Sequence, residues 1–414
     1  MVIYDIAVVG AGPAGIMAAI RLGQLNKNVI LIERNDDIGR KLLLSGNGRC
    51  NITNISSLEV FIKNFGKQGN FLKPAFYAFS NHHLIDFLKA KGLFFKIEDQ
   101  GRVFPTTNKA FSVVNVLKKY LAENKVTVLH NMRISALERK DGLFELVFDA
   151  DNHDKICAAK VILATGGISH KKTGSSGDGF CIAKSLGHTI IDLSPALVPL
   201  RAEEPWIKEL QGLSLNEARI SIQCGNKKVV SPAGELLFTH YGISGPLALD
   251  VSSTVVSALA DNKKVVLSID FIPTVSHEQL RARLLSECTK GGNRQIQSVI
   301  KNFLSKRLTS VVMQLLDIDL STQANQITKK ERLLIADILK HFPLTITAPL
   351  SIEEAMVTNG GIATKEINAK TMESRLVPGL YFAGEIIDGC GKSGGYNLQQ
   401  AFSTGYLAGE KSCA

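Results

Sequence analysis

The start of the chain holds a glycine-rich turn and an acidic residue at a spacing that can bind a dinucleotide. The turn is Gly10-Ala11-Gly12-Pro13-Ala14-Gly15, and Glu33 follows about twenty residues later. Gly10 permits a sharp turn, Gly12 lets the backbone approach a pyrophosphate, and Gly15 lets a helix lie close to a strand. Free N–H groups at the start of that helix bind phosphates, and the acid accepts from ribose hydroxyls. FAD or NAD fits better than NADP, because Glu33 would repel a 2′-phosphate.

The segments around this turn are those that a βαβ unit needs. An apolar run from Val2 to Val9 precedes it, and a helical pattern from Ile16 to Leu22 follows. A second apolar run, Val29 to Ile32, ends at the acid. A glycine pattern alone is a weak signal, but two strands, a helix and an acid in this order make it specific. A glycine turn in some other βαβ unit is the disfavoured alternative.

Length and composition indicate a globular protein of two or three domains. The chain has 414 residues, of which 45% are hydrophobic and 21% charged. We expect a cytoplasmic protein with no membrane partner, because no apolar run is long enough to span a bilayer and the first strand begins too early for a signal peptide. The seven cysteines form no C-x-x-C pair and are odd in number, which argues against a disulfide scaffold and a metal site.

The hydrophobic pattern predicts an α/β fold in which a Rossmann-like domain of the two-dinucleotide-binding flavoprotein type is split by insertions. We expect its two parts at residues 1–190 and 357–414. Short alternating segments predict a β-barrel-like domain at 191–274 and 343–356. Residues 275–342 have a helical period and form a helical insertion, with capping boxes at Ser276 to Gln279 and Thr328 to Glu331. An amphipathic pattern from Ile296 to Leu304 predicts another helix there.

Three later segments extend the nucleotide domain. A strand from Lys160 to Thr165 closes at a glycine turn, Ala164 to Gly167, which resembles the place where such flavoproteins return to the cofactor. A strand from Leu380 to Glu385 also ends in a glycine and an acid. Gly394 to Gln399 opens the last helix. These segments predict that the cofactor site is completed by residues far apart in the sequence.

One polar block makes the chain resemble a known family. The block Ser45-Gly46-Asn47-Gly48-Arg49-Cys50-Asn51-Ile52-Thr53-Asn54, with Arg40-Lys41-Leu42 before it, is similar to that of the BaiN/YhiN-type flavoproteins, which are NAD(P)/FAD-dependent oxidoreductases. The blocks Thr173 to Gly179, Gly234 to Pro246 and Gly384 to Gln399 resemble the same family. The resemblance covers essentially the whole chain. It implies a split FAD domain, a β-barrel-like domain and a helical insertion.

The resemblance also implies a set of FAD contacts. They are Gly10, Gly12, Ala14, Gly15, Glu33, Arg34, Lys41, Ser45, Gly46, Ile134, Gly166, Gly384, Glu385, Asn397 and Leu398. Pro13, Thr165 and Gly395 lie in the same turns, and we include them. Glu385 can accept hydrogen bonds from ribityl hydroxyls. The helix that begins near Asn397 can aim its N–H dipoles at the flavin and stabilise the reduced anion.

Three residues are candidates for catalysis. Cys50 lies in the polar block and could be a charge-transfer thiol or a proton donor. A small packed residue is the favoured alternative, because a reactive thiol needs a lowered pKa. His240 and Tyr241 lie in a predicted loop and are candidate proton donors for the reduction of carbon, although polar loop residues are often only structural.

The net charge of +10 is concentrated in the helical insertion. Between residues 281 and 309 the basic residues are Arg281, Arg283, Lys290, Arg294, Lys301, Lys306 and Arg307, with Glu287 as the one acid. Such a set is either a phosphate-binding surface, which ribosomal RNA would fit, or a solvated helical face.

We therefore expect an FAD-dependent oxidoreductase. The resemblance implies reduction of an activated C=C bond, either of uridine to dihydrouridine in large-subunit ribosomal RNA or of a small molecule such as an unsaturated steroid ketone. No second G-x-G-x-x-G follows a strand, so either NAD(P)H binds transiently over the flavin as the donor or another reductant serves. The other hypotheses are a non-catalytic flavoprotein that binds RNA or protein, and an oxidase of amines or amino acids.

Overall fold

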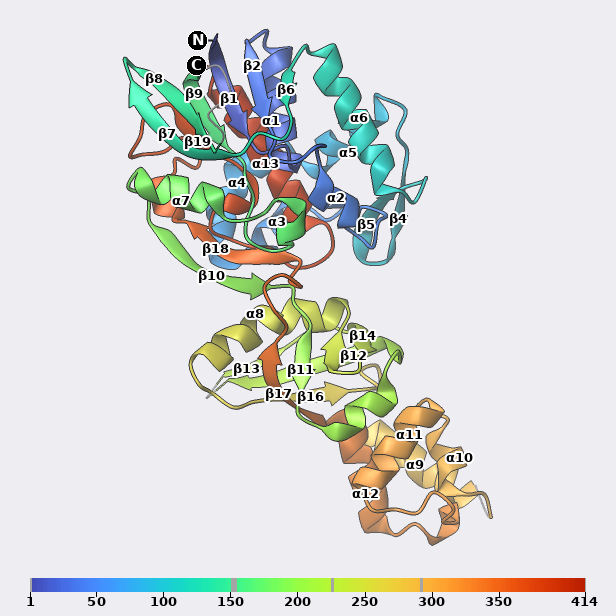
Figure 1. Cartoon of the computed structure of the whole chain (residues 1–414). Coiled ribbons are helices and arrows are strands. Elements are labelled where there is room, and N and C mark those ends of the chain that lie inside the picture. The colour runs from blue at the N-terminus through green and yellow to red at the C-terminus, as the bar shows by residue number, and fades with distance from the viewer. Residues whose placement is uncertain (1, 150–154, 225–226, 291–292, 414) are drawn as a thin grey trace. The chain divides into compact units, whose positions relative to one another are not determined.

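The chain forms two compact units, one of which is split in sequence by the other (Figure 1). The computed structural model describes residues 2–149, 155–224, 227–290 and 293–413. The first unit comprises residues 1–196 and 352–414, and the second comprises residues 197–351. The predicted interruption of the nucleotide domain by a long insertion is therefore present.

The first unit is built on a seven-stranded sheet. In spatial order its strands are β6 (Thr127–Leu129), β2 (Val29–Ile32), β1 (Val2–Val9), β9 (Ile156–Leu163), β8 (Leu143–Phe148) and β7 (Ile134–Lys140), and β19 (Leu380–Phe382) pairs with β9. The pairs that link β6, β2, β1, β9 and β19 are parallel, whereas β7, β8 and β9 pair antiparallel. This mixed sheet is the predicted Rossmann-like core.

The register of the parallel strands brings their carboxyl ends to one edge of the sheet. Val9 pairs with both Ile32 and Leu163, and Leu163 pairs with Phe382. The residues that follow these strands, among them Gly10, are therefore gathered at the same edge. In open parallel sheets this edge is where ligands bind.

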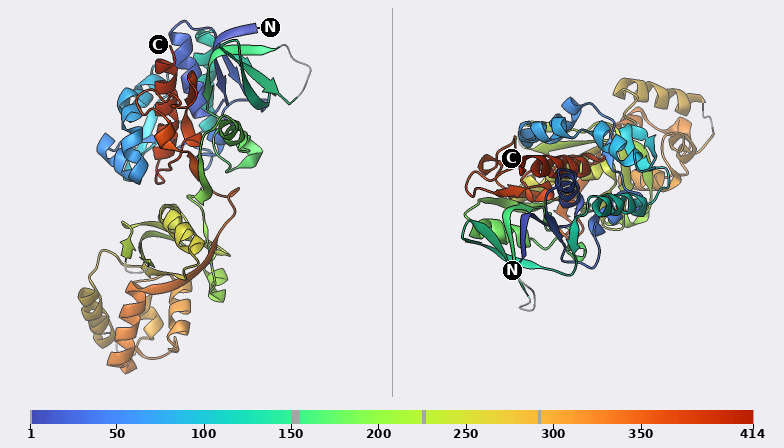
Figure 2. Two further views of the ribbon diagram at one scale, coloured as in Figure 1. Left: turned by 90° about the vertical axis from the view of Figure 1, so that its left-hand side faces the viewer. Right: turned by 90° about the horizontal axis from the view of Figure 1, so that it is seen from above.

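Two helices from opposite ends of the chain lie side by side in the first unit (Figures 1 and 2). These are α1 (Pro13–Gln24) and α13 (Tyr396–Lys411). A Cβ on Gly405 would lie 2.1 Å from the Ala14 carbonyl oxygen, so only glycine allows this approach. The last helix of the chain thereby supports the helix of the opening βαβ unit.

Smaller elements complete the first unit. The remaining helices are α2 (Arg40–Leu44), α3 (Leu58–Asn64), α4 (Gly69–Ala78), α5 (Asn81–Lys89), α6 (Ala110–Glu123) and α7 (Asp178–Ser185). Two small antiparallel sheets consist of β3 (Thr53–Asn54), β5 (Arg102–Pro105) and β4 (Phe95–Glu98), and of β10 (Ile190–Ala196) and β18 (Val357–Ile362). They hold the connections that run past the carboxyl edge of the large sheet.

The second unit contains a closed antiparallel barrel. Its strands, in order, are β13 (Lys227–Val230), β12 (Ser214–Cys224), β14 (Gly234–Phe238), β15 (Gly242–Ser244), β11 (Leu200–Ala202), β17 (Phe342–Pro349) and β16 (Val265–Asp270). Because β16 also pairs with β12, the sheet closes on itself and leaves β13 outside the ring. Closure pairs the sheet edges that would otherwise be exposed. Helix α8 (Pro246–Ala260) packs against the barrel strands.

Four helices lie between barrel strands β16 and β17 in the chain: α9 (His277–Lys290), α10 (Ile296–Ile300), α11 (Lys306–Leu315) and α12 (Lys329–Lys340). Both predicted capping boxes are confirmed, since side chains and backbone N–H groups bond reciprocally at the starts of α9 and α12. The predicted helix over 296–304 is too long. It ends at Ile300, and the hydroxyl of Ser305 then caps the separate helix α11. These helices share one hydrophobic core with the barrel.

Among the helices in the described ranges, none has both the length and the apolar character that a membrane span requires.

Candidate functional site

The glycine turn after β1 leaves room for a ligand at one position and none at two others. Gly10 has a φ of +100°, and a Cβ there would lie 2.6 Å from the Ala164 carbonyl oxygen. A Cβ on Gly15 would lie 1.9 Å from the Gly10 carbonyl oxygen. By contrast, a Cβ on Gly12 would meet no atom within 4 Å. The space beside Gly12 is therefore open at the start of α1, as a bound pyrophosphate requires.

The first turn of α1 supplies hydrogen-bond donors to this space. Pro13 is the first helical residue, and the first N–H that returns to the turn is that of Ile16, which donates to Gly12. The N–H groups of Ala14 and Gly15 precede it and have no acceptor within the helix. They are available to phosphate oxygens, and the positive end of the helix dipole favours such an anion.

Glu33 lies directly after β2 and is only 7% exposed. Its Oε2 accepts a hydrogen bond from the Ala11 N–H at 2.8 Å, and its Oε1 accepts from the backbone and side-chain amides of Asn35 at 2.9 and 2.6 Å. A carboxylate can accept about four hydrogen bonds. One acceptor position on Oε2 is thus left for a ribose hydroxyl. The Met132 N–H donates to the Glu33 carbonyl, which places the buried Ile134 beside this end of the site.

The turn after β9 holds a buried hydroxyl group that has no partner in the described part of the chain. The Oγ1 atom of Thr165 is shielded from solvent and makes no hydrogen bond there. Gly166 follows it, with a φ of +75°. The Thr165 oxygen packs against Gly179 of α7, where a Cβ would lie 2.0 Å from it. The open space at Gly12 and the free N–H groups at the start of α1 are the features that fit FAD.

Lys41 and Glu385 form an ion pair at the same edge. The Lys41 Nζ lies 2.6 Å from Glu385 Oε2 and 2.7 Å from the Ser169 Oγ. The other carboxylate oxygen accepts from Ser169 at 3.2 Å and from the Thr358 N–H at 2.8 Å. Protein groups therefore occupy most of the acceptor positions that the sequence assigned to ribityl hydroxyls. Gly384, just before this acid, packs against Ala14.

Sequence reasoning missed Ser169 and Thr358 as partners of Glu385. Ser169 lies two residues after the predicted Gly166-Gly167 turn, which was the one local signal for it. Thr358 lies in β18, and nothing in the sequence near it indicates its contact with an acid 27 positions away.

The start of α13 is tied to the polar block of residues 45–54. The Thr53 Oγ1 donates to Gln399 Oε1 at 2.7 Å, and the Asn54 amide donates to the Gly394 carbonyl at 3.1 Å. A Cβ on Gly395 would lie 2.4 Å from the Thr53 carbonyl oxygen. The block therefore fixes where the last helix begins.

Asn397 and Leu398, two predicted flavin contacts at the start of α13, direct their side chains to other parts of the protein. Asn397 accepts from the Gly391 N–H at 2.7 Å and donates to the Gly391 and Lys392 carbonyls at 3.0 and 3.2 Å. Its side chain therefore closes the loop before α13, and its backbone is what remains for a cofactor. The half-buried Leu398 packs against the core of the first unit.

The polar block itself turns tightly. The Ser45 hydroxyl donates to the Leu42 carbonyl at 2.6 Å, and a Cβ on Gly46 would lie 2.8 Å from the Asn51 nitrogen. Cys50 is fully buried, and burial raises the pKa of its thiol to about 12. A thiol in this state is protonated at neutral pH and shielded from substrate. This environment favours the packed residue over the catalytic thiol.

His240 and Tyr241 lie in the second unit, whereas Cys50 and every predicted FAD contact lie in the first. They occupy the loop between β14 and β15. Their ring centroids are 4.8 Å apart, and the Tyr241 carbonyl accepts from the Ala202 N–H at 2.9 Å. His240 is exposed and Tyr241 is partly buried. The structure therefore places His240 and Tyr241 next to each other in one loop.

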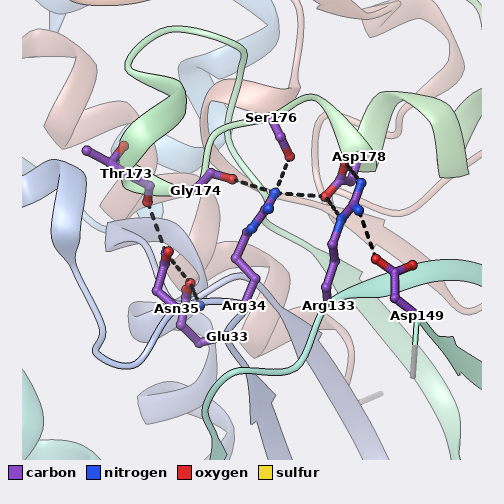
Figure 3. Close-up of polar contacts among 9 residues, drawn as sticks. All are labelled: Glu33, Arg34, Asn35, Arg133, Asp149, Thr173, Gly174, Ser176 and Asp178. Atoms are coloured by element: carbon purple, nitrogen blue, oxygen red, sulfur yellow. Dashed lines mark hydrogen bonds and ion pairs between the residues drawn. The ribbon is translucent and has the colours of Figure 1, made fainter. Parts of the chain in front are cut away.

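Arg34 and Arg133 meet at Asp178, near Glu33 (Figure 3). This cluster lies where the chain leaves β2 and enters β7, at the end of the site marked by the acid of the βαβ unit. The sequence predicted Arg34 as an FAD contact. It placed Asp178 in a block that resembles the family, but it assigned no contact to Asp178 or Arg133.

Comparisons with known proteins agree with this geometry. The family model of the HI0933-like protein Rossmann domain matches residues 4–411. The chain is 32% identical to a 3-dehydro-bile acid delta(4,6)-reductase of Clostridium scindens, over 98% of each chain. It is 31% identical to a ribosomal RNA dihydrouridine synthase of Haemophilus influenzae, over 96% of each, and 29% identical to one of Escherichia coli, over 98% of this chain and 97% of that one.

Solved structures show the same fold at low sequence identity. A 3-ketosteroid delta1-dehydrogenase from Sterolibacterium denitrificans matches with a TM-score of 0.55 and 12% identity, over 99% of each chain. A flavocytochrome c3 fumarate reductase matches with a TM-score of 0.53 and 15% identity, over 99% of this chain and 78% of that one. The family match over nearly the whole chain, together with a site that fits FAD, shows that the chain belongs to the HI0933-like Rossmann family of FAD-dependent oxidoreductases.

Proposed function

We propose that this protein is a reductase of an activated C=C bond, and that its substrate is uridine in large-subunit ribosomal RNA. FAD would bind along the carboxyl edge of the first sheet, through the residues that the sequence assigned to it. Bound FAD supplies the hydride that such a reduction needs. NAD(P)H is the proposed donor of that hydride to the enzyme.

RNA is proposed as the substrate because the second unit has a cluster of basic residues. This basic cluster consists of Arg281, Arg283, Lys290, Arg294, Lys301, Lys306 and Arg307. All seven side chains are exposed on α9, α11 and the adjoining loops. Within the described ranges, Lys290, Lys301 and Lys306 have no carboxylate at ion-pair distance. Exposed cations without counter-charges are what a phosphate backbone requires.

All four arginines of the basic cluster have contacts within the protein, and Arg294 lies 3.8 Å from the Glu287 carboxylate. Arg281 donates to Asp337 at 3.1 Å, Arg307 donates to the Gln211 carbonyl at 2.7 Å, and the Arg283 guanidinium lies 4.9 Å from the centre of the Phe303 ring. These contacts hold the cations in place on the surface. We therefore assign the phosphate contacts first to the three lysines.

The remaining requirement is a proton for the carbon next to the one that receives hydride. His240 and Tyr241 are the proposed donors, because an imidazole and a phenol can each release a proton and the two side chains adjoin. Cys50 is the weaker candidate on account of its burial and raised pKa.

Two measurements test this function. Anaerobic titration of the purified holoprotein with NADPH and then NADH should bleach the 450 nm flavin band, and added unmodified ribosomal RNA should restore it. Nucleoside analysis of ribosomal RNA from a deletion strain should show less dihydrouridine than the parent strain contains. Unchanged dihydrouridine would exclude the RNA substrate, and a flavin that neither nucleotide bleaches would exclude the proposed donor.

A steroid ketone is the second candidate substrate, because a bile acid reductase is among the relatives. In that case an unsaturated steroid ketone, and not ribosomal RNA, should reoxidise the reduced flavin. A non-catalytic flavoprotein would show neither bleaching nor turnover with any acceptor, and rapid peroxide formation from an amine would indicate an oxidase.

A further inference from the structure

The carboxylate of Asp178 receives hydrogen bonds from two guanidinium groups that lie in different parts of the sequence (Figure 3). Asp178 is the first residue of α7, Arg34 follows β2, and Arg133 precedes β7. Arg133 binds both carboxylate oxygens, with Nε–Oδ2 and Nη2–Oδ1 distances of 2.8 Å, and Arg34 Nη1 lies 3.0 Å from Oδ2. A bidentate pair of this kind fixes the orientation of both partners.

Further hydrogen bonds attach segment 173–178 to the residues that follow β2. Arg34 also donates to the Ser176 hydroxyl, and the Asn35 amide donates to the Thr173 carbonyl at 3.0 Å. That amide is also bonded to Glu33 Oε1 at 2.6 Å. Two separate sets of hydrogen bonds therefore hold segment 173–178 (Figure 3). One runs from Glu33 through Asn35 to Thr173, and the other joins Arg34 and Arg133 to Ser176 and Asp178. We call Arg34, Asn35, Arg133, Ser176 and Asp178 the clasp.

The backbone of segment 173–178 lies close to the side chains of Arg34 and Asn35 at Gly174. A Cβ on Gly174 would lie 2.5 Å from the Asn35 amide nitrogen and 3.3 Å from Arg34 Cδ. A larger residue at this position would push the segment away from both side chains. The hydrogen bonds from Arg133 hold the pKa of Asp178 below its usual value, so the carboxylate is charged at neutral pH.

The position of the clasp relates it to one half of the cofactor. In a βαβ dinucleotide site the acid after the second strand binds the ribose of the adenosine half. Glu33 is that acid, and Arg34 and Asn35 follow it directly. We propose that Asp178 is a positioning residue, which holds segment 173–178 beside the adenosine half of FAD through Arg34 and Arg133 and so sets the affinity for FAD. This inference rests on the FAD site and not on the substrate.

The test compares two flavins on the full-length protein. Asp178→Asn keeps the shape of the side chain and removes its charge. FAD should bind about 10-fold more weakly to this variant, since a partly exposed charged pair is screened by solvent and contributes modestly. FMN lacks the adenosine half, so its dissociation constant should not change. Equal losses for FAD and FMN, or an unchanged affinity for FAD, would overturn the proposal.

A matched control removes a comparable ion pair elsewhere in the same unit. Glu145→Gln in β8 breaks contacts to Lys140 and Lys155 at 3.2 and 3.0 Å, and it should leave the FAD affinity as it is. The thermal midpoint of both apoproteins shows whether each variant folds.

If FMN binds wild type too weakly to measure, ADP replaces it as the probe. ADP carries the adenosine half, so Asp178→Asn must weaken the binding of ADP by the same factor as the binding of FAD. An unchanged affinity for ADP would contradict the proposed role of the clasp. None of these measurements uses a substrate. A failure of the proposed reductase activity would therefore leave the result interpretable.

Discussion

Lys41 and Glu385 lie 344 positions apart in the sequence, and their side chains form an ion pair at 2.6 Å. Their side chains are 23% and 17% exposed. Through Ser169 and Thr358 the same carboxylate also contacts the turn after β9 and strand β18. One acid thus joins four segments around the cofactor edge, which makes it a structural centre of the site as well as a predicted cofactor contact.

Replacing Lys41 by methionine should destabilise the protein, because it leaves a mostly buried carboxylate without its cation. We expect the free energy of unfolding to fall by about 1–3 kcal/mol, less than for a fully buried pair because some solvent reaches both groups. Urea unfolding measures it. The control Lys118→Met breaks the more exposed pair with Asp37 and should cost less than about 1 kcal/mol. Equal effects of the two variants would contradict the central role of Glu385.

Alanine at Gly12 and at Gly15 should have opposite consequences. Gly15→Ala places a Cβ against the Gly10 carbonyl and should destabilise the apoprotein by about 1–3 kcal/mol, the cost of overpacking. Gly12→Ala meets open space and should change stability by less than about 1 kcal/mol. Its added methyl group would occupy the phosphate space, so the purified protein should carry less FAD. Full FAD content in Gly12→Ala would place the pyrophosphate elsewhere.

Cys50 should resist alkylation in the folded protein. With a thiol pKa of about 12, only on the order of one thiol in ten thousand is ionised at pH 8, and the thiolate fraction rises only as the pH approaches that value. Iodoacetamide should therefore modify the exposed Cys181 long before Cys50, as peptide mass spectrometry can show.

A substitution checks the same point by activity. Cys50→Ala should keep flavin turnover close to that of wild type. A loss of about 100-fold, the size expected for removal of a general acid, would instead make Cys50 catalytic.

Asp388 should destabilise the folded protein at neutral pH. It lies between Glu385 and α13, and burial raises the pKa of its carboxyl group, opposed by a hydrogen bond from Gln68 at 2.9 Å. Because the folded state then binds the proton more tightly than the unfolded state, stability falls as the pH rises from the ordinary value of 3.8 through the folded pKa.

Asp388→Asn keeps an acceptor for Gln68 and removes the charge. It should stabilise the protein at pH 7 by less than about 1 kcal/mol, since the half-buried group is partly screened. At pH 3 the variant and wild type should unfold alike, which chemical denaturation at both pH values measures. A destabilised variant at pH 7 would mean that the charged carboxylate has a partner outside this chain, such as a ligand.

The three unpaired lysines of the basic cluster should govern the salt dependence of RNA binding. Lys290→Gln, Lys301→Gln and Lys306→Gln together should lower the slope of log affinity against log salt by about 2, at about 0.7 for each lost phosphate contact. Flavin bleaching by NAD(P)H should be unaffected. The control triple variant Lys89→Gln, Lys119→Gln and Lys125→Gln removes exposed lysines of the first unit. If both triple variants lower the slope equally, the cluster is only a solvated face.

The sequence by itself determined the βαβ unit, the mixed Rossmann-like core and the barrel. It did so because these features depend on local patterns: apolar runs mark buried strands, alternation marks barrel strands, and a capping box marks a helix start. Gly10, Gly15 and Glu33 have the environments expected of them for the same reason. The contacts of Gly15 with Gly10 and of Glu33 with Ala11 lie within one βαβ unit, whereas Gly10 also packs against Ala164 after β9.

Only the tertiary structure decided which groups share the carboxylates of the site. The ion pair of Lys41 with Glu385 and the clasp at Asp178 depend on strand register and on the return of the chain after a long insertion. No local pattern encodes either. The protonated state of Cys50 follows from burial, which is fixed only when distant segments pack around the thiol and exclude water.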